Sequence, residues 1–576
     1  MRAQLLKKII FIFFLLLCAA CAYNQLIKES YYFRLSQNNR IKLVKLSAAR
    51  GEIYDRKGKI LAGRRLIFNA AVLPQETRNI EKSIKALSPI LNISEQRLLR
   101  QFKRNFSAPF IPVVLACDIP KEKAVVLECR ESDIPGLVVR TESLRDYRSR
   151  RSFSHILGYL GRLREEELKR VKTYGLGGIE DLVGRSGVEE AFDAYLRGER
   201  GGKQVEVDSR GHLVKVLGLR EPLSGEKLYL TIDADLQRYV EGLLEEKKGV
   251  CIVMDVERGE ILSMVSKPDF DPNMFITALN GNLKAGRQIS ELLTSKEAPL
   301  VNRAISGTYP PGSIFKIVVA AAALETGKIT IDEKFNCPGC FKVGRREFFC
   351  WNLDGHGNED IHSALCHSCN VFFYRLGLAV GPDKISSFAR RFGLGSATGV
   401  DLPYESTGLV PSKSWKYKVK KEKWYDGETA NFSIGQGYLL VTPLQITQLI
   451  SAVANGGYLV RPHIVKRIGE EEAAVSRKKI GLKEETLEII KEGMRRVIGD
   501  ERGTGHRARI AGVEWAAKTG TAQALESRPA HGWFGAFYPF DEPRISVLVF
   551  LEYGGSGGDV PAVMAKQIVD FYAQLQ

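Results

Sequence analysis

The first strong hydrophobic signal is an unbroken apolar run from Ile9 to Tyr23, which follows a short basic segment. Leu26 and Ile27 extend this run. A run of this length behind basic residues predicts a membrane signal-anchor over residues 9–27, with residues 1–8 on the cytoplasmic side. A cleaved signal peptide is one alternative, because alanines near residue 20 resemble a cleavage site. Processing as a lipoprotein at Cys21 is another. No second long apolar run follows, so we expect a single-pass protein with most of the chain exported.

The region that follows the anchor mixes short strand and helix patterns. Asp55 to Gly58 is typical of a tight turn between two short strands, and helical spacing recurs near residues 80–104 and 119–131. The segment from Gly184 to Gly211 is rich in glycine and charge, which by composition alone predicts an exposed connector.

The pattern changes at Lys227, where an alternating β-like run to Asp233 leads into a helix that we expect to reach about Lys248. Residues 249–254 and 260–266 then alternate on either side of Arg258-Gly259, as in a hairpin. Two further strands, over 532–540 and 544–552, precede a closing helix over 561–575. Strands at both ends with helices between them predict one α+β domain over residues 227–576, whose antiparallel sheet closes late in the chain.

The composition is that of a globular protein with an anionic neighbour. The 576 residues predict two to four domains, and 44% hydrophobic with 26% charged residues excludes a disordered chain. A net charge of +17 indicates a membrane face, an acidic polymer or nucleic acid. Because no nucleic-acid-binding motif is present, we expect no nucleic acid partner. The basic run from Lys416 to Lys423 is expected to be a solvated loop.

The first candidate for chemistry is Ser313, which follows Pro310-Pro311-Gly312 and precedes an apolar stretch. This context predicts that Ser313 lies at the first turn of a buried helix, with Lys316 one turn further on the same face. The helix N-terminus favours a developing alkoxide, and a lysine in a partly apolar cleft can serve as a base. The spacing alone is weak, because Ser224/Lys227 and Ser476/Lys479 share it.

The second candidate is Lys518-Thr519-Gly520, which occurs once in the chain. The surrounding residues predict a β-strand with a buried lysine, and an ammonium and a hydroxyl on a strand edge can receive a peptide carboxylate. Ser368 and Asn370 lie between the two candidates. An ordinary strand with a solvated lysine is the plain alternative for the triplet taken alone.

The joint order of Ser313/Lys316, Ser368/Asn370 and Lys518-Thr519-Gly520 resembles the motif set of penicillin-binding proteins and serine β-lactamases. Residues 308–316, 435–445, 516–523 and 531–534 are similar to class B penicillin-binding proteins. Residues 50–62 and 184–211 resemble their non-catalytic pedestal. The resemblance implies a membrane anchor, an elongated mixed α/β pedestal (dimerisation-type) domain over residues 28–226 and a C-terminal penicillin-binding transpeptidase domain.

The resemblance also implies a role for each site residue. Ser313 would attack the D-alanyl-D-alanine bond of a peptidoglycan stem peptide, releasing D-alanine, with Lys316 as its base. Ser368 would relay a proton to the leaving amine, and Asn370 would bind Lys316 and the donor amide. Lys518 and Thr519 would hold the terminal carboxylate, Gly520 would permit close approach, and the N–H groups of Ser313 and Thr521 would form an oxyanion hole. β-Lactams would acylate the same serine.

Five of the ten cysteines cluster between residues 337 and 369, near His356. The Cys350-Trp351 and Gly355-His356-Gly357 elements resemble the elongation-type subgroup, penicillin-binding protein 2. Some of its members carry a metal with ligands spaced like Cys337, Cys350, His356 and Cys369, and such a set suits tetrahedral zinc. A disulfide from Cys337 to Cys350 or Cys340 is the alternative. The catalysis itself requires no cofactor.

The resulting hypothesis is a single-pass inner-membrane D,D-transpeptidase whose catalytic domain faces the periplasm and acts in cell elongation. The resemblance implies a SEDS-family glycosyltransferase and a pedestal-binding activator as partners. A septal transpeptidase of the same class is the nearest alternative. A β-lactam sensor, a serine β-lactamase and a non-catalytic scaffold for wall synthesis are further ones.

Overall fold

The computed structural model describes residues 2–32, 40–77, 79–164, 166–167, 182–208, 210, 212–524 and 528–575. The chain divides into two compact units. The first unit comprises Met1–Arg50, Arg64–Arg145 and Arg197–Gly225. The second comprises Gly51–Gly63, Asp146–Leu196 and Glu226–Gln576.

The first unit begins with a long apolar helix. The α-helix α1 (Arg2–Ala22) continues into a π-helical turn η1 (Tyr23–Ile27), and 24 residues from Gln4 to Ile27 are apolar enough to cross a membrane. All of these side chains are solvent-exposed within the protein. An exposed apolar helix of this length requires a lipid or protein environment, in agreement with the predicted anchor.

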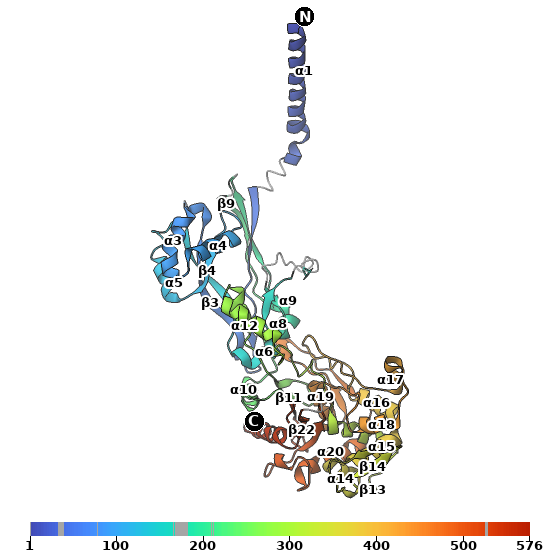
Figure 1. Ribbon diagram of the computed structural model, residues 1–576. Coiled ribbons are helices and arrows are strands. Elements are labelled where there is room, and N and C mark those ends of the chain that lie inside the picture. Colours follow the sequence, from blue (N-terminus) through green and yellow to red (C-terminus); the bar gives the residue numbers. More distant parts are fainter. Residues whose placement is uncertain are drawn as a thin grey trace. The chain divides into compact units, whose positions relative to one another are not determined.

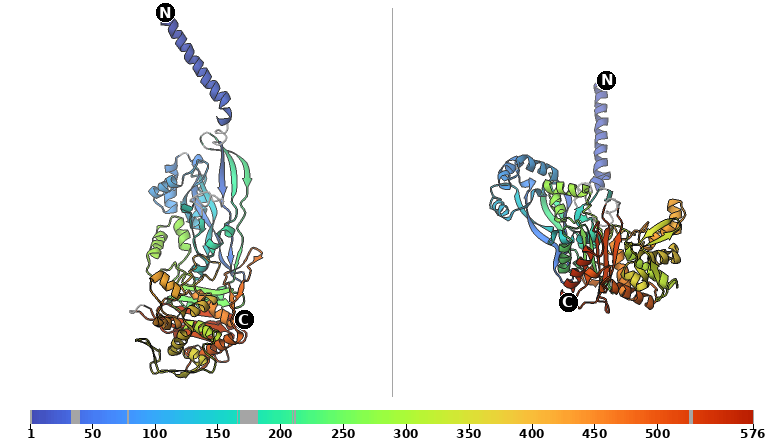
Figure 2. Two further views of the ribbon diagram at one scale, coloured as in Figure 1. Left: turned by 90° about the vertical axis from the view of Figure 1, so that its right-hand side faces the viewer. Right: turned by 60° about the horizontal axis from the view of Figure 1, so that its bottom comes forward.

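A three-stranded antiparallel sheet follows in the same unit, in the order β1-β8-β9. Its strands are β1 (Ile41–Leu46), β8 (Gly201–Val207) and β9 (Leu213–Arg220), and Figure 2 shows them as a long ribbon. Because Ile41 of β1 lies opposite Glu206 of β8, this sheet joins segments from the two ends of the first unit.

The rest of the first unit is a small α/β layer. Helices α3, α4 and α5 gather beside β4 (Figure 1), and their apolar sides form a core with Ala70, Val72 and Leu115. The helical spacing predicted over residues 80–104 gives two helices, because Asn92 adopts a left-handed φ of 59° and ends the first one. The elements are β3 (Ile60–Val72), η2 (Pro74–Glu76), α3 (Ile80–Leu91), α4 (Glu95–Asn105), β4 (Val113–Ile119), α5 (Lys121–Glu128) and β5 (Leu137–Tyr147).

The second unit is built on a five-stranded antiparallel sheet in the order β12-β11-β23-β22-β21. The expected hairpin, the late strands and the closing helix are all present. The helix predicted to reach Lys248 ends earlier, at Leu243. The elements are β10 (Leu228–Leu230), α10 (Ala234–Leu243), β11 (Gly249–Asp255), β12 (Ile261–Lys267), β21 (Ala516–Ala522), β22 (His531–Tyr538), β23 (Ile545–Leu551) and α21 (Val560–Leu575).

Helices cover both faces of this sheet. On one face α10 and α21 pack on alternate residues such as Val253, Phe534 and Val547, and on the other face lies α19 (Pro443–Ala454). Figure 1 shows α10 and α19 with β11 and β22 between them. Since both faces are covered, nearly every residue of β11, β22 and β23 is buried. The strand order leaves β21 at one edge of the sheet.

A helical layer completes the second unit beside the sheet. It contains the serine-bearing turn η5 (Gly312–Phe315) with α13 (Lys316–Glu325), and α14 (Ile361–Cys366) packed on α20 (Glu484–Gly499). The remaining elements here are β13 (Phe335–Cys337), β14 (Cys340–Val343), β15 (Arg346–Phe349), β16 (Gly357–Glu359), α15 (Asn370–Val380), α16 (Pro382–Arg391), α17 (Lys413–Lys420), α18 (Asp426–Ser433) and η6 (His506–Ala508).

Short elements make up the remainder of the second unit. Asp55 to Gly58 forms the expected turn, between β2 (Ile53–Tyr54) and β3, and its Gly58 has a φ of 85°. Also present are η3 (Arg150–Phe153), α6 (Ser154–Leu157), β6 (Leu160–Arg162), β7 (Leu182–Gly184), α8 (Gly187–Ala191), α9 (Asp193–Leu196), α11 (Asn273–Leu279), α12 (Leu283–Thr294), β17 (Tyr458–Val460), β18 (Val465–Ile468), β19 (Glu471–Glu472) and β20 (Arg477–Lys479).

Two composition-based predictions are wrong. Residues 184–191 do not form an exposed connector: Glu189 on α8 is fully buried and accepts a hydrogen bond of 3.2 Å from the Tyr147 hydroxyl. The basic run from Lys416 is largely helical, since α17 extends to Lys420. Lys416 is 1% exposed and paired at 2.5 Å with Glu428. In both places a charged residue is buried beside a partner, which composition does not reveal.

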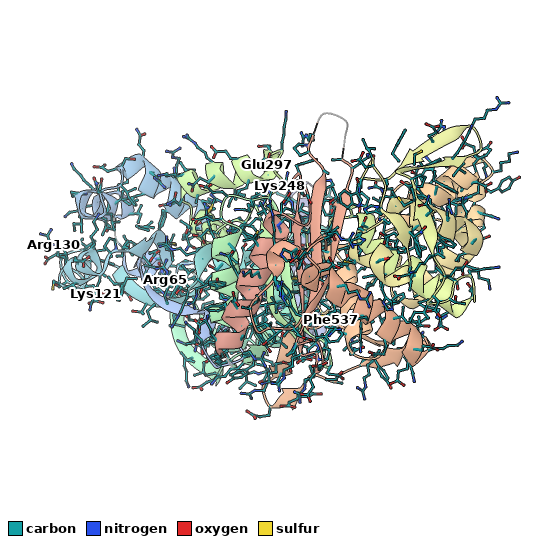
Figure 3. All side chains as sticks on the ribbon, turned by 90° about the horizontal axis from the view of Figure 1, so that it is seen from below. Arg65, Lys121, Arg130, Lys248, Glu297 and Phe537 are labelled. Carbon is teal, nitrogen blue, oxygen red and sulfur yellow. The ribbon has the colours of Figure 1, made fainter. Side chains whose placement is uncertain are left out.

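A buried group of charges anchors the end of β23. Glu552 accepts hydrogen bonds from Arg303 at 2.9 Å and from the Tyr309 hydroxyl at 2.6 Å, and it pairs with Lys248 at 3.1 Å. Lys248 also reaches Glu297, and Figure 3 shows these two side chains near each other. Burial favours a raised pKa for Glu552, but the hydrogen bond from Tyr309 and the charge of Arg303 outweigh it, and the pKa is lowered. Tyr309 therefore has a fixed position just before the Pro-Pro-Gly turn.

Candidate active site

Ser313 lies in the 3-10 turn η5, directly before α13, as the sequence predicts. The turn depends on Gly312, whose φ is 56° and whose N–H donates to Gly435 O at 3.1 Å. A Cβ atom on Gly312 would lie 2.7 Å from Thr521 O. Glycine at this position therefore lets the serine turn approach strand β21 closely.

Ser368 and Asn370 sit at the junction of α14 and α15. Ser368 adopts a left-handed φ of 52°, which is uncommon for a residue with a side chain, and the Cys369 thiol caps α15 by accepting from Phe372 N. The Ser368 carbonyl accepts from the indole N–H of Trp351 at 3.2 Å. A strained residue held from both sides is typical of a functional position.

Lys316 joins the first two motifs. Its Nζ is fully buried and donates to Ser368 O at 2.8 Å, to Asn370 Oδ1 at 2.7 Å and to Ser368 Oγ at 3.2 Å. Three acceptors suit an ammonium with three N–H donors. Burial lowers the pKa of Lys316 to about 8, although the neighbouring thiols of Cys369 and Cys350 act in the opposite direction. The neutral amine is therefore accessible near physiological pH.

Lys518 joins the third motif to the second. It is fully buried on β21, and its Nζ donates to Ser368 Oγ at 3.0 Å and to Thr519 O at 3.1 Å. Burial, followed by the charge of Lys316, lowers its pKa. Two lysines thus meet at one hydroxyl oxygen. Because Ser368 Oγ accepts from both, its own proton is free to point toward another group.

Thr519 takes part in a chain of hydroxyl groups that the sequence did not reveal. Its Oγ1 donates to Thr504 Oγ1 at 2.7 Å, and Thr504 Oγ1 donates to Cys366 O at 3.2 Å. While this chain holds, the Thr519 hydroxyl can only accept from a ligand. Donation to a carboxylate requires the Thr504 hydroxyl to turn toward Thr519 and release the Cys366 carbonyl.

Gly520 packs against protein. A Cβ atom there would lie 2.9 Å from Pro311 O and 3.0 Å from the Trp533 side chain. The glycine thus keeps β21 and the turn before Ser313 in close contact. A direct contact of Gly520 with substrate stays a prediction.

The motifs meet at a cleft of about 920 Å³. Lys316 and Lys518 lie behind its wall and reach it through Ser368. The cleft is lined by residues from all three motifs and from the loops around them: Ser313, Glu347, Phe348, Phe349, Cys350, Trp351, Ser368, Asn370, Tyr374, Asn431, Ile434, Gln436, Gly437, Gly503, Thr504, His506, Arg507, Thr519, Thr521, Gln523, Ser556, Gly558 and Asp559.

The four predicted metal ligands are close together next to this wall. Cys337, Cys350, His356 and Cys369 each offer a ligand atom within 4.8 Å of the others, and His356 Nδ1 lies 3.6 Å and 3.5 Å from the Cys337 and Cys350 sulfurs. Cys337, Cys350 and Cys369 are buried free thiols. Three thiols and an imidazole at such spacing fit the donor set of a tetrahedral zinc site.

Two residues of the site were missed in the sequence. Trp351 donates its indole N–H to the carbonyls of His367 and Ser368, and Thr504 links Thr519 to Cys366. In the sequence, Trp351 stands out only as part of the Cys350-Trp351 element. Thr504 stands between two glycines in Gly503-Thr504-Gly505, which is a signal for a turn but not for a function.

Comparison with known proteins agrees with this architecture. Residues 249–570 match the penicillin-binding protein transpeptidase domain, and residues 45–230 match the penicillin-binding protein dimerisation domain. The peptidoglycan D,D-transpeptidase MrdA of Acinetobacter baumannii is 34% identical over 98% of this chain and 86% of its own length.

Solved structures are similar over most of the chain. Penicillin-binding protein 2 of Helicobacter pylori, in its complex with MreC, has a TM-score of 0.83 at 29% identity, covering 93% of this chain and 99% of that one. A chain from a peptidoglycan synthase complex that coordinates polymerisation and crosslinking has a TM-score of 0.76 at 29% identity, covering 100% and 99%.

Fold and site together define a serine-type D,D-transpeptidase. The chain belongs to the penicillin-binding protein family, in its class B, penicillin-binding protein 2-like branch.

Proposed function

We propose that this protein cross-links peptidoglycan stem peptides through an acyl-enzyme on Ser313, releases D-alanine, and is acylated by β-lactams at the same residue. The observation that carries the proposal is the meeting of Lys316 and Lys518 at Ser368 Oγ, at 3.2 Å and 3.0 Å, in the wall of the cleft that Ser313 lines. This arrangement provides a base, a proton relay and a cation in contact with one another.

The geometry suggests how each group acts. Neutral Lys316 takes the Ser313 proton, which is favoured because burial has already lowered the lysine pKa to about 8. Ser368, whose oxygen accepts from both lysines, passes its own proton to the leaving D-alanine amine and receives in exchange, from Lys316, the proton that came from Ser313. Asn370 Oδ1 accepts from Lys316 at 2.7 Å and keeps that lysine directed toward the cleft. An amine of a second stem peptide then attacks the acyl group.

The edge strand β21 is proposed to hold the donor peptide. Its free edge can pair with an extended chain. Lys518 attracts the terminal carboxylate, Thr519 and Thr521 contact it from the cleft wall, and Gly520 keeps the strand against the serine turn. The N–H groups of Ser313 and Thr521 complete an oxyanion hole, a device typically worth roughly 3–4 kcal/mol of barrier lowering.

Labelling with a fluorescent penicillin tests the nucleophile. The wild-type protein should carry the label and Ser313→Ala should not. The matched control is Ser476→Ala, which removes an exposed serine with the same Ser-x-x-Lys spacing. An unlabelled wild type, or a labelled Ser313→Ala, contradicts the proposal. Loss of the label within minutes would indicate a β-lactamase in place of a transpeptidase.

The proposed domain organisation is a cytoplasmic tail over residues 1–8, a membrane anchor over 9–27, a pedestal over 28–226 and a transpeptidase domain over 227–576. The exposed apolar helix and the basic residues before it support a single-pass protein of the inner membrane with its catalytic domain in the periplasm. The likeness to MrdA supports a role in cell elongation.

Two kinds of protein partner are proposed from the similar structures. The complex of a penicillin-binding protein 2 with MreC supports an activator that binds the pedestal. The peptidoglycan synthase complex supports a SEDS-family glycosyltransferase in the membrane.

A structural zinc ion at Cys337, Cys350, His356 and Cys369 is also proposed. Their donor atoms fit it, and Cys369 lies between Ser368 and Asn370, so a metal would hold that motif in place. Metal analysis of the purified protein should find zinc that is lost in Cys337→Ser. A disulfide formed by Cys337, detected by mass spectrometry of the unreduced protein, contradicts this site.

A further inference from the structure

A second cluster of metal-ligating side chains lies in the same unit and shares no residue with the first. Cys366, His367 and Asp500 each offer a ligand atom within 4.8 Å of the other two. Cys366 and His367 are buried, and Asp500 is partly exposed. None of the three lines the cleft, and no step of the proposed reaction uses them.

His367 is oriented like a metal ligand. Its Nδ1 lies 2.9 Å from Glu359 Oε1, and a carboxylate at one ring nitrogen is the usual partner that directs the other nitrogen toward a metal. The other nitrogen, Nε2, is buried and makes no hydrogen bond in the described part of the chain, while the imidazole side chain is 8% exposed. A buried ring nitrogen without a partner is costly unless something binds it.

The surroundings favour a cation. Cys366 and His367 stand at the C-terminal end of α14, and Asp500 caps the C-terminal end of α20. Both helix ends direct partial negative charge toward the cluster, which attracts a cation. One Asp500 oxygen accepts from Arg502 N at 2.8 Å, so the second remains available as a ligand.

We propose that Cys366, His367 and Asp500 bind a second divalent metal ion of the zinc class. One thiolate, one imidazole and one carboxylate suit zinc, and the exposed side at Asp500 leaves the fourth position to water. The Cys366 thiol donates to Arg496 O at 3.3 Å. Binding breaks this hydrogen bond and displaces the thiol proton to solvent, and no electron is transferred.

The site would tie two catalytic motifs together. Cys366 O accepts from Thr504 N at 3.3 Å and from Thr504 Oγ1 at 3.2 Å, and Thr504 Oγ1 accepts from Thr519. Ser368 follows His367 directly. A metal that holds Cys366, His367 and Asp500 therefore fixes both the turn before Ser368 and the hydroxyl chain that reaches Thr519.

Zinc stoichiometry of the full-length protein tests this inference. After removal of metal by a chelator, the protein is titrated with Zn²⁺ in competition with a chromophoric chelator. The wild type should bind one equivalent more than Asp500→Asn and one more than Cys366→Ser. Glu359→Gln should lower the affinity for that additional zinc ion by about 10- to 100-fold, as loss of an orienting carboxylate does. The matched control is Glu501→Gln, an exposed carboxylate next to Asp500, which should keep the wild-type number.

The outcomes separate this site from the first cluster. Cys337→Ser should remove the zinc ion of the first cluster. The double variant Cys337→Ser/Asp500→Asn should therefore bind two zinc ions fewer than the wild type. If Asp500→Asn and Cys366→Ser both bind as much zinc as the wild type, the second site does not exist. Asp500 is partly exposed and lies outside the core, so Asp500→Asn should fold, and it decides the question even where Cys366→Ser fails to fold. Penicillin labelling reports on Ser313 independently of either metal count.

Discussion

Ser368 Oγ is the atom on which the site is organised. It accepts a hydrogen bond from Lys316, on the helix after Ser313, and another from Lys518, on the edge strand. The three residues come from different parts of the chain. Because both lysines are fully buried, each depends on the few polar atoms around it for the stability of its charged form. Changes at either lysine should therefore affect the chemistry more than the fold.

Replacement of Lys518 tests its role as the receiver of the carboxylate. Lys518→Ala should reduce the rate of acylation by both peptide substrate and penicillin by about 100-fold or more, because the loss of a buried hydrogen-bonded charge pair costs about 2–5 kcal/mol. Rates of penicillin labelling measure the effect, and circular dichroism checks that the fold is intact. Acylation of Lys518→Ala at the wild-type rate would mean that the triplet does not receive the carboxylate.

The pH dependence of acylation follows from Lys316. Its pKa is lowered to about 8, so the ammonium dominates below that pH and the basic amine above it. The second-order rate constant for penicillin acylation should fall about tenfold per pH unit below roughly pH 7 and level off above roughly pH 9. Stopped-flow measurement over pH 5.5–9.5 checks this. A profile that is flat across this range contradicts Lys316 as the base.

The sequence predicted the residues that the structure brings together at the cleft, because a hydroxyl before a buried helix and a lysine on a strand edge are local patterns. Thr504 and Trp351 could not be found in this way. Thr504 reaches the site because the turn after α20 packs against strand β21, where Thr504 contacts Thr519. Trp351 reaches it because its loop packs against Ser368, which has a left-handed backbone conformation. Partners brought in by tertiary packing leave no periodic signal.

At the scale of elements, the central contact is between β21 and the turn η5. The strand patterns at the two ends of the catalytic domain were predictable from their alternation. The helical nature of residues 413–420 and the burial of Glu189 were not, because a buried ion pair or hydrogen bond looks like surface charge in the sequence.

Gly520→Ala tests the close contact of β21 with the serine turn. The added methyl would lie 2.9 Å from Pro311 O, so the strand or the turn must shift. A shift of this kind at reacting groups should slow penicillin acylation by about 100-fold. Gly242→Ala, where a methyl meets nothing within 4 Å, is the control and should acylate normally. Wild-type acylation by Gly520→Ala would show that the contact tolerates the methyl group.

Glu552→Gln tests the charge group at the end of β23. The change leaves Arg303, which is 5% exposed, without its ionic partner, and the loss of one member of such a buried pair costs about 3–5 kcal/mol. Chemical unfolding followed by tryptophan fluorescence measures the loss. The control is Glu199→Gln, in an ion pair whose side chains are 71% and 65% exposed, where about 0–1 kcal/mol is expected. Equal effects in both variants would rule out a structural role for the buried pair.

At the scale of the whole molecule, the chain combines an apolar helix that suits a membrane with two units of different character. The class of enzyme was predictable from the sequence, because its motifs occur in one order along the chain. The role in elongation, as opposed to division, was predicted from fewer residues, the Cys350-Trp351 and Gly355-His356-Gly357 elements, and the similarity to MrdA agrees with it.

Depletion of the protein in its host distinguishes these two roles. If it acts in elongation, rod-shaped cells should become round as the protein is lost. If it acts in division, they should form filaments. Microscopy over several generations gives the answer, and re-expression of Ser313→Ala should fail to restore the wild-type shape, whereas Ser476→Ala should restore it.

The order of strands in the catalytic sheet has a consequence for how the protein is made. Strand β11 pairs on one side with β12, which follows at once, and on the other side with β23, where Gly249 lies opposite Leu551. During synthesis and export the apolar hairpin of β11 and β12 therefore waits, with one edge unpaired, until nearly the whole chain has emerged. Contacts this distant in sequence form slowly, and an open apolar edge invites aggregation. The nascent protein should therefore depend on chaperones, and truncation before β23 should yield an insoluble product.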